Sequence, residues 1–85
     1  KGETDVYPNP VSSGELQVRV YADKDEEATL TLLNSSSQPV VEIRRRVTKG
    51  YNSIILPVGK VSNGMYFLQV RRGAKQTVKK VIIEK

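Results

Sequence analysis

The chain has 85 residues, of which 14 are Lys or Arg and 9 are Asp or Glu, giving a formal charge of +5. A domain this small buries only about 60–65% of the surface that its unfolded chain exposes, which argues against a deep active-site cavity. The sequence has no cysteine and no histidine, which excludes disulfides and zinc–thiolate sites and argues against an enzyme, since histidine is the commonest general base and metal ligand.

The N-terminal residues indicate how the chain is organised. No apolar run approaches the roughly 20 residues that a membrane-spanning helix needs, and the first residues lack the apolar region of a signal peptide. The chain begins with polar residues and without methionine. We therefore expect a piece of a longer protein, in which residues 1–5 end a linker and residues 6–85 form a single domain.

The first third of the chain predicts one edge strand and one regular strand. Residues 6–10 contain Pro8 and Pro10, which cannot donate hydrogen bonds to a ladder, so this strand should be rigid and peripheral. After a turn at residues 12–14, residues 15–21 alternate between apolar and polar side chains, which is typical of a half-buried strand. The residues expected to face inward are Leu16, Val18 and Val20.

The middle third predicts three strands separated by polar segments. A polar connection at residues 22–27 precedes the first of them, and residues 34–39 have the composition of a turn. Residues 40–47 form the second strand, and a turn at residues 49–50 leads to the third. The residues expected to face inward are Ala28, Leu30, Leu32, Val41, Ile43, Val47, Ile54 and Leu56. In the loop that follows, Val58 and Val61 are expected to close one end of the core.

The last third predicts a hairpin whose first strand is the densest apolar segment of the chain. Asn63-Gly64 can supply the positive φ angles of a tight turn, and alternation then places Tyr66, Leu68 and Val70 on one face. The other face is half apolar, because it carries Met65, Phe67, Gln69 and Arg71. The sequence alone does not decide whether Phe67 is buried.

A charged turn around Gly73 precedes the predicted final strand, residues 77–85. Val81 and Ile83 fall on one face of this strand, whereas Val78 and Ile82 fall on the other. Either both faces are covered, or one face offers apolar surface to a partner. We expect the strand to lie at or near a sheet edge, and its last three residues to be the least enclosed part of the sheet.

Together these segments predict an all-β fold. About seven short segments of period two follow one another at intervals of about 8–12 residues, without a helical stripe of useful length. This spacing favours an immunoglobulin-like antiparallel β-sandwich over any α/β arrangement. An open barrel of five or six strands is the alternative, since a single sequence does not show how strands are shared between sheets.

Two clusters of charged residues are candidate binding sites. Asp23, Asp25, Glu26 and Glu27 offer oxygen ligands for calcium, but the segment lacks the central glycine and distal glutamate of an EF-hand, so a solvated loop without metal is expected. Basic residues at 44–46, 71–72 and 79–80 could contact nucleic acid or lipopolysaccharide phosphates. Because alternation turns Arg45 away from its neighbours, we expect a solvated sheet face and no nucleic acid.

Several segments, in this order, carry a resemblance that extends over nearly the whole chain: Tyr7-Pro8-Asn9-Pro10, Leu16 to Val20, Lys49-Gly50-Tyr51-Asn52, Gly64 to Val70, and Lys79 to Lys85. In these segments and their order, the sequence resembles the C-terminal sorting domain of the type IX (Por) secretion system. The basic run Arg44-Arg45-Arg46 departs from this resemblance.

The resemblance implies a role without catalysis and without a cofactor. Such a domain lies at the C-terminus of a cargo protein and directs it from the periplasm of a Gram-negative bacterium across the outer membrane. A sortase-like protease typically removes the domain as the cargo is anchored to surface lipopolysaccharide. The partners implied are therefore protein components of the secretion machinery and this protease, with contact to anionic lipopolysaccharide as a further expectation.

We expect recognition to use the folded surface together with the last strand, which can offer backbone hydrogen bonds and alternating side chains to a receptor strand. The candidate recognition residues are Pro8, Asn9, Pro10, Gly64, Met65, Phe67, Lys80, Val81, Ile82, Ile83, Glu84 and Lys85. The alternative is an immunoglobulin-like adhesive or carbohydrate-binding module of a secreted surface protein, whose aromatic platform would have to come from Tyr7, Tyr21, Tyr51 and Phe67.

Overall fold

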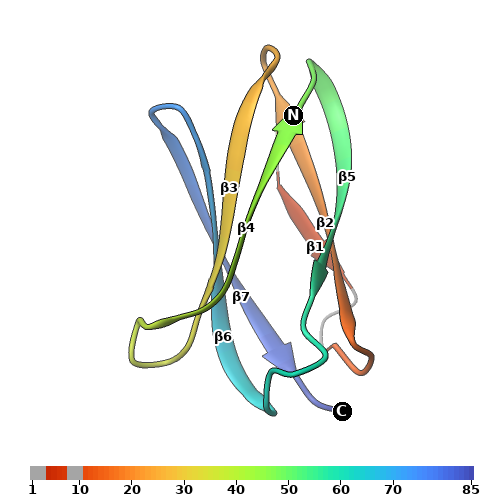
Figure 1. The fold of residues 1–85 in the computed structure, drawn as a ribbon, viewed down its shortest axis with the longest axis vertical. Helices are drawn as coiled ribbons and strands as arrows, with labels where there is room; N and C mark the ends of the chain where they lie inside the picture. Colours follow the sequence, from red (N-terminus) through yellow and green to blue (C-terminus); the bar gives the residue numbers. More distant parts are fainter. Residues whose placement is uncertain (1–3, 8–10) are drawn as a thin grey trace.

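The computed structural model describes residues 4–7 and 11–85, and in this part of the chain it contains seven strands and no helix (Figure 1). The strands are β1 (Asp5–Tyr7), β2 (Glu15–Ala22), β3 (Glu26–Leu33), β4 (Pro39–Val47), β5 (Gly50–Pro57), β6 (Gly64–Arg72) and β7 (Lys75–Ile83). The described residues therefore include no helix that could cross a membrane.

The strands form two sheets that face each other across the core (Figure 1). One sheet has the order β1-β2-β5 and the other has the order β4-β3-β6-β7, and the paired strands are antiparallel. This arrangement confirms the predicted β-sandwich and rules out the barrel. In an immunoglobulin constant domain the fourth strand lies in the same sheet as the first and second, whereas here β4 lies in the other sheet and pairs with β3.

Alternation predicted the core correctly. Inward side chains of β2 and β5 meet those of β3 and β6, and a buried aliphatic core of this kind is the main stabilising contribution to folding. The buried residues include Leu16, Val18, Val20, Leu30, Leu32, Leu56, Leu68 and Val70. Val58 also lies in the core, as predicted, whereas Val61 is only partly buried. Val41 and Ile43 are half-buried, because β4 is an edge strand with a neighbour on one side only.

Two predicted boundaries were wrong. The polar connection at residues 22–27 is shorter than predicted, because Ala22 is buried as the last residue of β2 and β3 already begins at Glu26. The final strand runs from Lys75 to Ile83 instead of residues 77–85. Its early start follows from a two-residue turn, in which Gly73 has a φ of 57° and occupies the position where type II′ hairpin turns place glycine.

Tyr66 joins the core to the loop that precedes β6. Its ring is buried, with 6% of the residue exposed, and its hydroxyl donates a hydrogen bond to the backbone oxygen of Ser62 at 2.7 Å. A tyrosine near the start of the sixth strand that bonds back to the preceding turn is the tyrosine corner of immunoglobulin-like sandwiches. The structure thus confirms the inward placement of Tyr66 and adds its hydroxyl contact.

The first strand begins slightly earlier than predicted. β1 begins at Asp5, which was assigned to the linker, and Thr4 is buried beside it. β1 is an edge strand, as expected, and pairs with β2. The predicted features of Pro8-Asn9-Pro10 lie outside the described residues.

Candidate recognition surface

The β6–β7 hairpin brings several of the candidate residues together on the outside of the larger sheet. Met65 lies directly opposite Ile82 and Phe67 lies opposite Lys80, while Leu33 of β3 flanks Phe67 on its other side. Directly opposed side chains on one face of a sheet are in contact range. We call this surface the outer hairpin face; its residues are Leu33, Met65, Phe67, Val78, Lys80 and Ile82.

The outer hairpin face is more apolar than a solvated sheet face requires. Met65 and Val78 are 40% and 52% exposed, and Phe67 and Ile82 are partly buried against their neighbours. Phe67, whose position the sequence left open, therefore lies outside the core. Lys80 and Gln69 lie on the same face, opposite Phe67 and Val78, so this surface combines exposed apolar side chains with polar ones.

The other face of β7 belongs to the core. Val81 is fully buried and Ile83 is 1% exposed, so neither side chain is accessible to a partner of the folded domain. Gly64 is exposed at the start of β6, and a Cβ added there would lie 3.5 Å from the Tyr66 ring. These three candidate residues support the hairpin and do not present side chains on its outer face.

β7 is an edge strand of the larger sheet, as predicted, but its C-terminal end is already paired with Val11. The amide of Val11 donates to the oxygen of Ile82 at 2.7 Å, and the amide of Glu84 donates to the oxygen of Val11 at 2.8 Å. Val11 and Ile83 form an isolated parallel bridge. In the domain alone, Val11 thus occupies ladder positions that the expected pairing with a receptor strand would use.

Lys85 is held by the loop that precedes β6. Its ammonium donates to the backbone oxygens of Val58, Gly59 and Val61 at 2.8, 2.9 and 2.7 Å, and its amide donates to Asn63 Oδ1 at 3.0 Å. An ammonium has three donors, and here each donor meets one carbonyl of the same loop. The prediction that the last three residues are the least enclosed part of the sheet is therefore wrong.

The acidic residues considered for calcium are engaged in protein contacts. Asp23 forms an ion pair with Lys75, and the hydrogen bond from Lys75 lowers the pKa of the Asp23 carboxyl. Asp25 Oδ1 accepts a hydrogen bond from the Lys49 amide at 2.9 Å. Glu26 pairs with Arg72 at 2.9 Å, and both side chains are largely buried. These carboxylates therefore connect neighbouring turns and strands.

The basic run on β4 divides between two faces, as alternation predicted. Arg45 lies opposite the buried Ala28 and so faces the space between the sheets, whereas Arg44 lies opposite Thr29 and faces outward. The Arg45 guanidinium donates to the backbone oxygen of Arg44 at 2.8 Å. An inward-facing charge on an edge strand is a known device against pairing with another strand.

The tyrosines of the smaller sheet are engaged with one another and with an arginine. Tyr21 lies opposite Tyr51, and their rings pack edge to face with centroids 5.1 Å apart. The guanidinium carbon of Arg19 lies 4.7 Å from the centroid of the Tyr51 ring, and Arg19 also pairs with Asp5 at 2.6 Å. These contacts fix the Tyr21 and Tyr51 rings on the outside of the smaller sheet, where Tyr51 remains 54% exposed.

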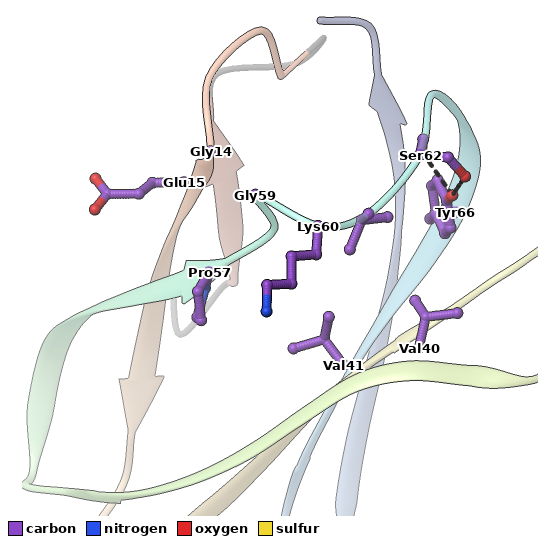
Figure 2. A pocket seen from close by; sticks show the side chains of 10 residues that line it. Gly14, Glu15, Val40, Val41, Pro57, Gly59, Lys60, Ser62 and Tyr66 are labelled. Atoms are coloured by element: carbon purple, nitrogen blue, oxygen red, sulfur yellow. Dashed lines mark hydrogen bonds between the residues drawn. The ribbon is translucent and has the colours of Figure 1, made fainter.

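A groove that the sequence did not predict lies between the two sheets, on the side where β4 and β5 are edge strands. It has a volume of about 660 Å³ and is lined by Gly14, Glu15, Val40, Val41, Pro57, Gly59, Lys60, Val61, Ser62 and Tyr66 (Figure 2). Its residues come from β2, β4, β5, β6 and the loop between β5 and β6. The groove could have been predicted only if the sequence had shown that β4 belongs to the larger sheet.

Comparison with known proteins gives one family. The family described as the secretion system C-terminal sorting domain matches residues 5–84, a range that begins with β1 and ends after β7. The search of curated proteins gave no match.

Proposed function

Because this chain belongs to the family of secretion system C-terminal sorting domains, it is a sorting signal for type IX secretion, and we propose that the export machinery reads it as a folded domain through the outer hairpin face. A protein that carries the domain is exported across the outer membrane to the cell surface or the medium. The family match over all seven strands is the observation that carries this assignment.

The choice of the outer hairpin face rests on exposure and chemistry. Val78 and Met65 present apolar surface to solvent, and the partly buried Phe67 lies opposite Leu33 on the same face. Lys80 lies opposite Phe67 and adds a positive charge at the centre of this face. Apolar anchors beside a charge suit a protein partner, since the former provide affinity and the latter provides orientation.

Backbone pairing remains part of the proposal, but at a different place. The first half of β7, residues 75–79, lies on the outer edge of the larger sheet, away from the contacts of Val11. A receptor strand could add to the sheet there and place its side chains beside Val78. The described structure thus favours the start of β7 over its end for β-augmentation.

The later steps of sorting complete the proposal. We propose that the domain passes through the periplasm of a Gram-negative bacterium, that a sortase-like protease removes it, and that basic side chains such as Lys80 and Arg71 contact anionic lipopolysaccharide. Family membership supports the first two steps, and the exposure of these cations supports the third. Pro8, Asn9 and Pro10 remain candidate recognition residues.

Two substitutions of matched exposure test whether the outer hairpin face is read. Val78 and Ile55 are 52% and 51% exposed, but Ile55 is on the outside of the smaller sheet. In a periplasmic reporter fused to this domain, Val78→Ser should lower the fraction exported, whereas Ile55→Ser should not. Both variants should remain folded, because neither side chain contributes much to the core.

Circular dichroism of each purified variant controls for folding. Equal export of the Val78→Ser and Ile55→Ser fusions, with both domains folded, would show that recognition uses another surface. The family assignment would survive that result, because it concerns the function of the domain and not the face that is read.

A further inference from the structure

The groove between β4 and the loop at residues 58–62 has the features of a small binding site. Its volume of about 660 Å³ lies within the range of protein clefts that enclose a small ligand or one to two side chains. Val40, Val41, Pro57 and Val61 give it apolar walls. Val40 is 44% exposed, so part of its side chain is accessible to a ligand.

The exposed Lys60 adds a positive charge to this apolar surface. Figure 2 shows the Lys60 side chain extending between Pro57 and Val41, whereas the Glu15 carboxylate is directed away from them. Within residues 4–7 and 11–85, no acidic side chain forms an ion pair with Lys60. The groove therefore combines apolar walls with a cation that has no acidic partner there, and a carboxylate would complement it.

The loop that carries Lys60 is held in place before any ligand binds. The Lys85 ammonium bonds three carbonyl oxygens of this loop, the Val58 amide donates to the oxygen of Gly14 at 2.8 Å, and the Tyr66 hydroxyl donates to Ser62. A site that is already ordered loses less conformational entropy on binding than a mobile one.

The strand beside the groove can also offer its backbone. β4 has β3 as its only neighbour among the described strands. Its C-terminal part is protected by the inward-facing Arg45, but the part next to the groove, residues 40–43, carries no such charge facing the core. An extended segment could pair here and place a side chain in the groove.

We propose that this groove binds an extended segment of a protein partner in which an apolar residue is followed by a carboxylate. The apolar side chain occupies the space between Val40, Val41 and Pro57, and the carboxylate pairs with Lys60. Lys85 acts as a positioning residue that holds the loop. The inference goes beyond the proposed function, because the groove lies between the sheets and away from the outer hairpin face.

The test uses blocked peptides and the isotopically labelled 85-residue chain. The probe is acetyl-Thr-Val-Leu-Asp-Thr-amide, and its control replaces Asp by Asn. Amide chemical-shift changes should concentrate at Val40, Val41 and residues 58–62. The Asn peptide should bind about tenfold more weakly, since it lacks the charge-assisted contact.

Variants of the domain distinguish the contribution of the Lys60 charge to peptide binding from that of the loop structure. Lys60→Gln should abolish the preference for the Asp peptide, while Lys24→Gln, at the opposite end of the molecule, should keep it. Lys85→Met should weaken binding of both peptides, because it loosens the loop and does not touch the ligand.

Equal binding of the two peptides by the unmodified domain would overturn the proposal, and so would the absence of shifts at the groove. Shifts at the groove that grow with protein concentration in the absence of peptide would also overturn it, because they would assign the groove to a second copy of the chain. None of these results bears on export through the outer hairpin face.

Discussion

Tyr66 shows how one side chain stabilises both the core and a loop. Its ring packs between the sheets, and its hydroxyl fixes the segment that leads into β6. That segment also carries Lys60 and the contacts of Lys85. A change at Tyr66 should therefore affect the free energy of unfolding through the ring and the geometry of the loop through the hydroxyl.

Substitutions at Tyr66 separate these contributions. Tyr66→Ala should lower the free energy of unfolding by about 3–5 kcal/mol, because it leaves a large cavity. Tyr66→Phe should cost about 1 kcal/mol, the typical net value of one hydrogen bond. Met65→Ala is the control, since Met65 is exposed on the adjacent position. Urea denaturation measures all three, and a Tyr66→Ala domain as stable as Met65→Ala would mean that the ring is not a core residue.

The ion pair between Glu26 and Arg72 could not be predicted from the sequence. Alternation from Tyr66 and Val70 places Arg72 on the inward face, but its charge favoured a turn. In the structure Arg72 extends β6 by pairing with Glu26, and their side chains are only 10% and 14% exposed. A largely buried charge is tolerated when it is paired, and the partner 46 residues away is not visible in the local pattern.

β7 combines two roles that alternate along its length. Val81 and Ile83 fill the core, while Val78, Lys80 and Ile82 belong to the outer hairpin face. The period of two predicted this division, which is why the candidate residues of β7 could be named from the sequence. Its edge position was also predicted, but the bridge to Val11 was not, because it joins segments that are far apart in the chain.

The C-terminal residues should contribute to stability more than their position suggests. Deletion of residues 83–85 removes the buried Ile83 and the loop contacts of Lys85. The loss of a buried isoleucine alone typically costs about 2–5 kcal/mol, a large part of the stability of a small domain. Deletion of Lys85 alone should cost much less, because no buried apolar group is lost.

Thermal unfolding of the two truncated domains checks this expectation. The shorter deletion serves as the control for the longer one. A domain without residues 83–85 that melts within a few degrees of the complete domain would show that Ile83 does not contribute to the core as its burial indicates.

At the scale of the whole molecule, the sequence predicted the sandwich and most of its core but not how the sheets divide the strands. Period two identifies strands and their inward faces, yet it carries no information about which strands pair across long loops. The position of β4 beside β3 therefore came only from the structure. The groove depends on this position of β4, because its walls belong to both sheets.

In the whole molecule, residues 82–85 are part of the folded domain. Val11, Lys85 and the loop at residues 58–62 tie the end of β7 into one end of the sandwich. A receptor that met these residues would meet a folded surface. The account therefore predicts that sorting information depends on the folded domain and in particular on the outer hairpin face.

The measurement that tests this claim most directly is the export of a periplasmic reporter fused to two versions of the domain. The first is the 85-residue chain, and the second carries Leu68→Asp, which places a charge in the core and should unfold the domain without altering the outer hairpin face in sequence. We predict surface display of the first fusion only, and only in cells with a functional type IX secretion pore. Surface display of the unfolded Leu68→Asp fusion through that pore, at the level of the folded one, would contradict the account.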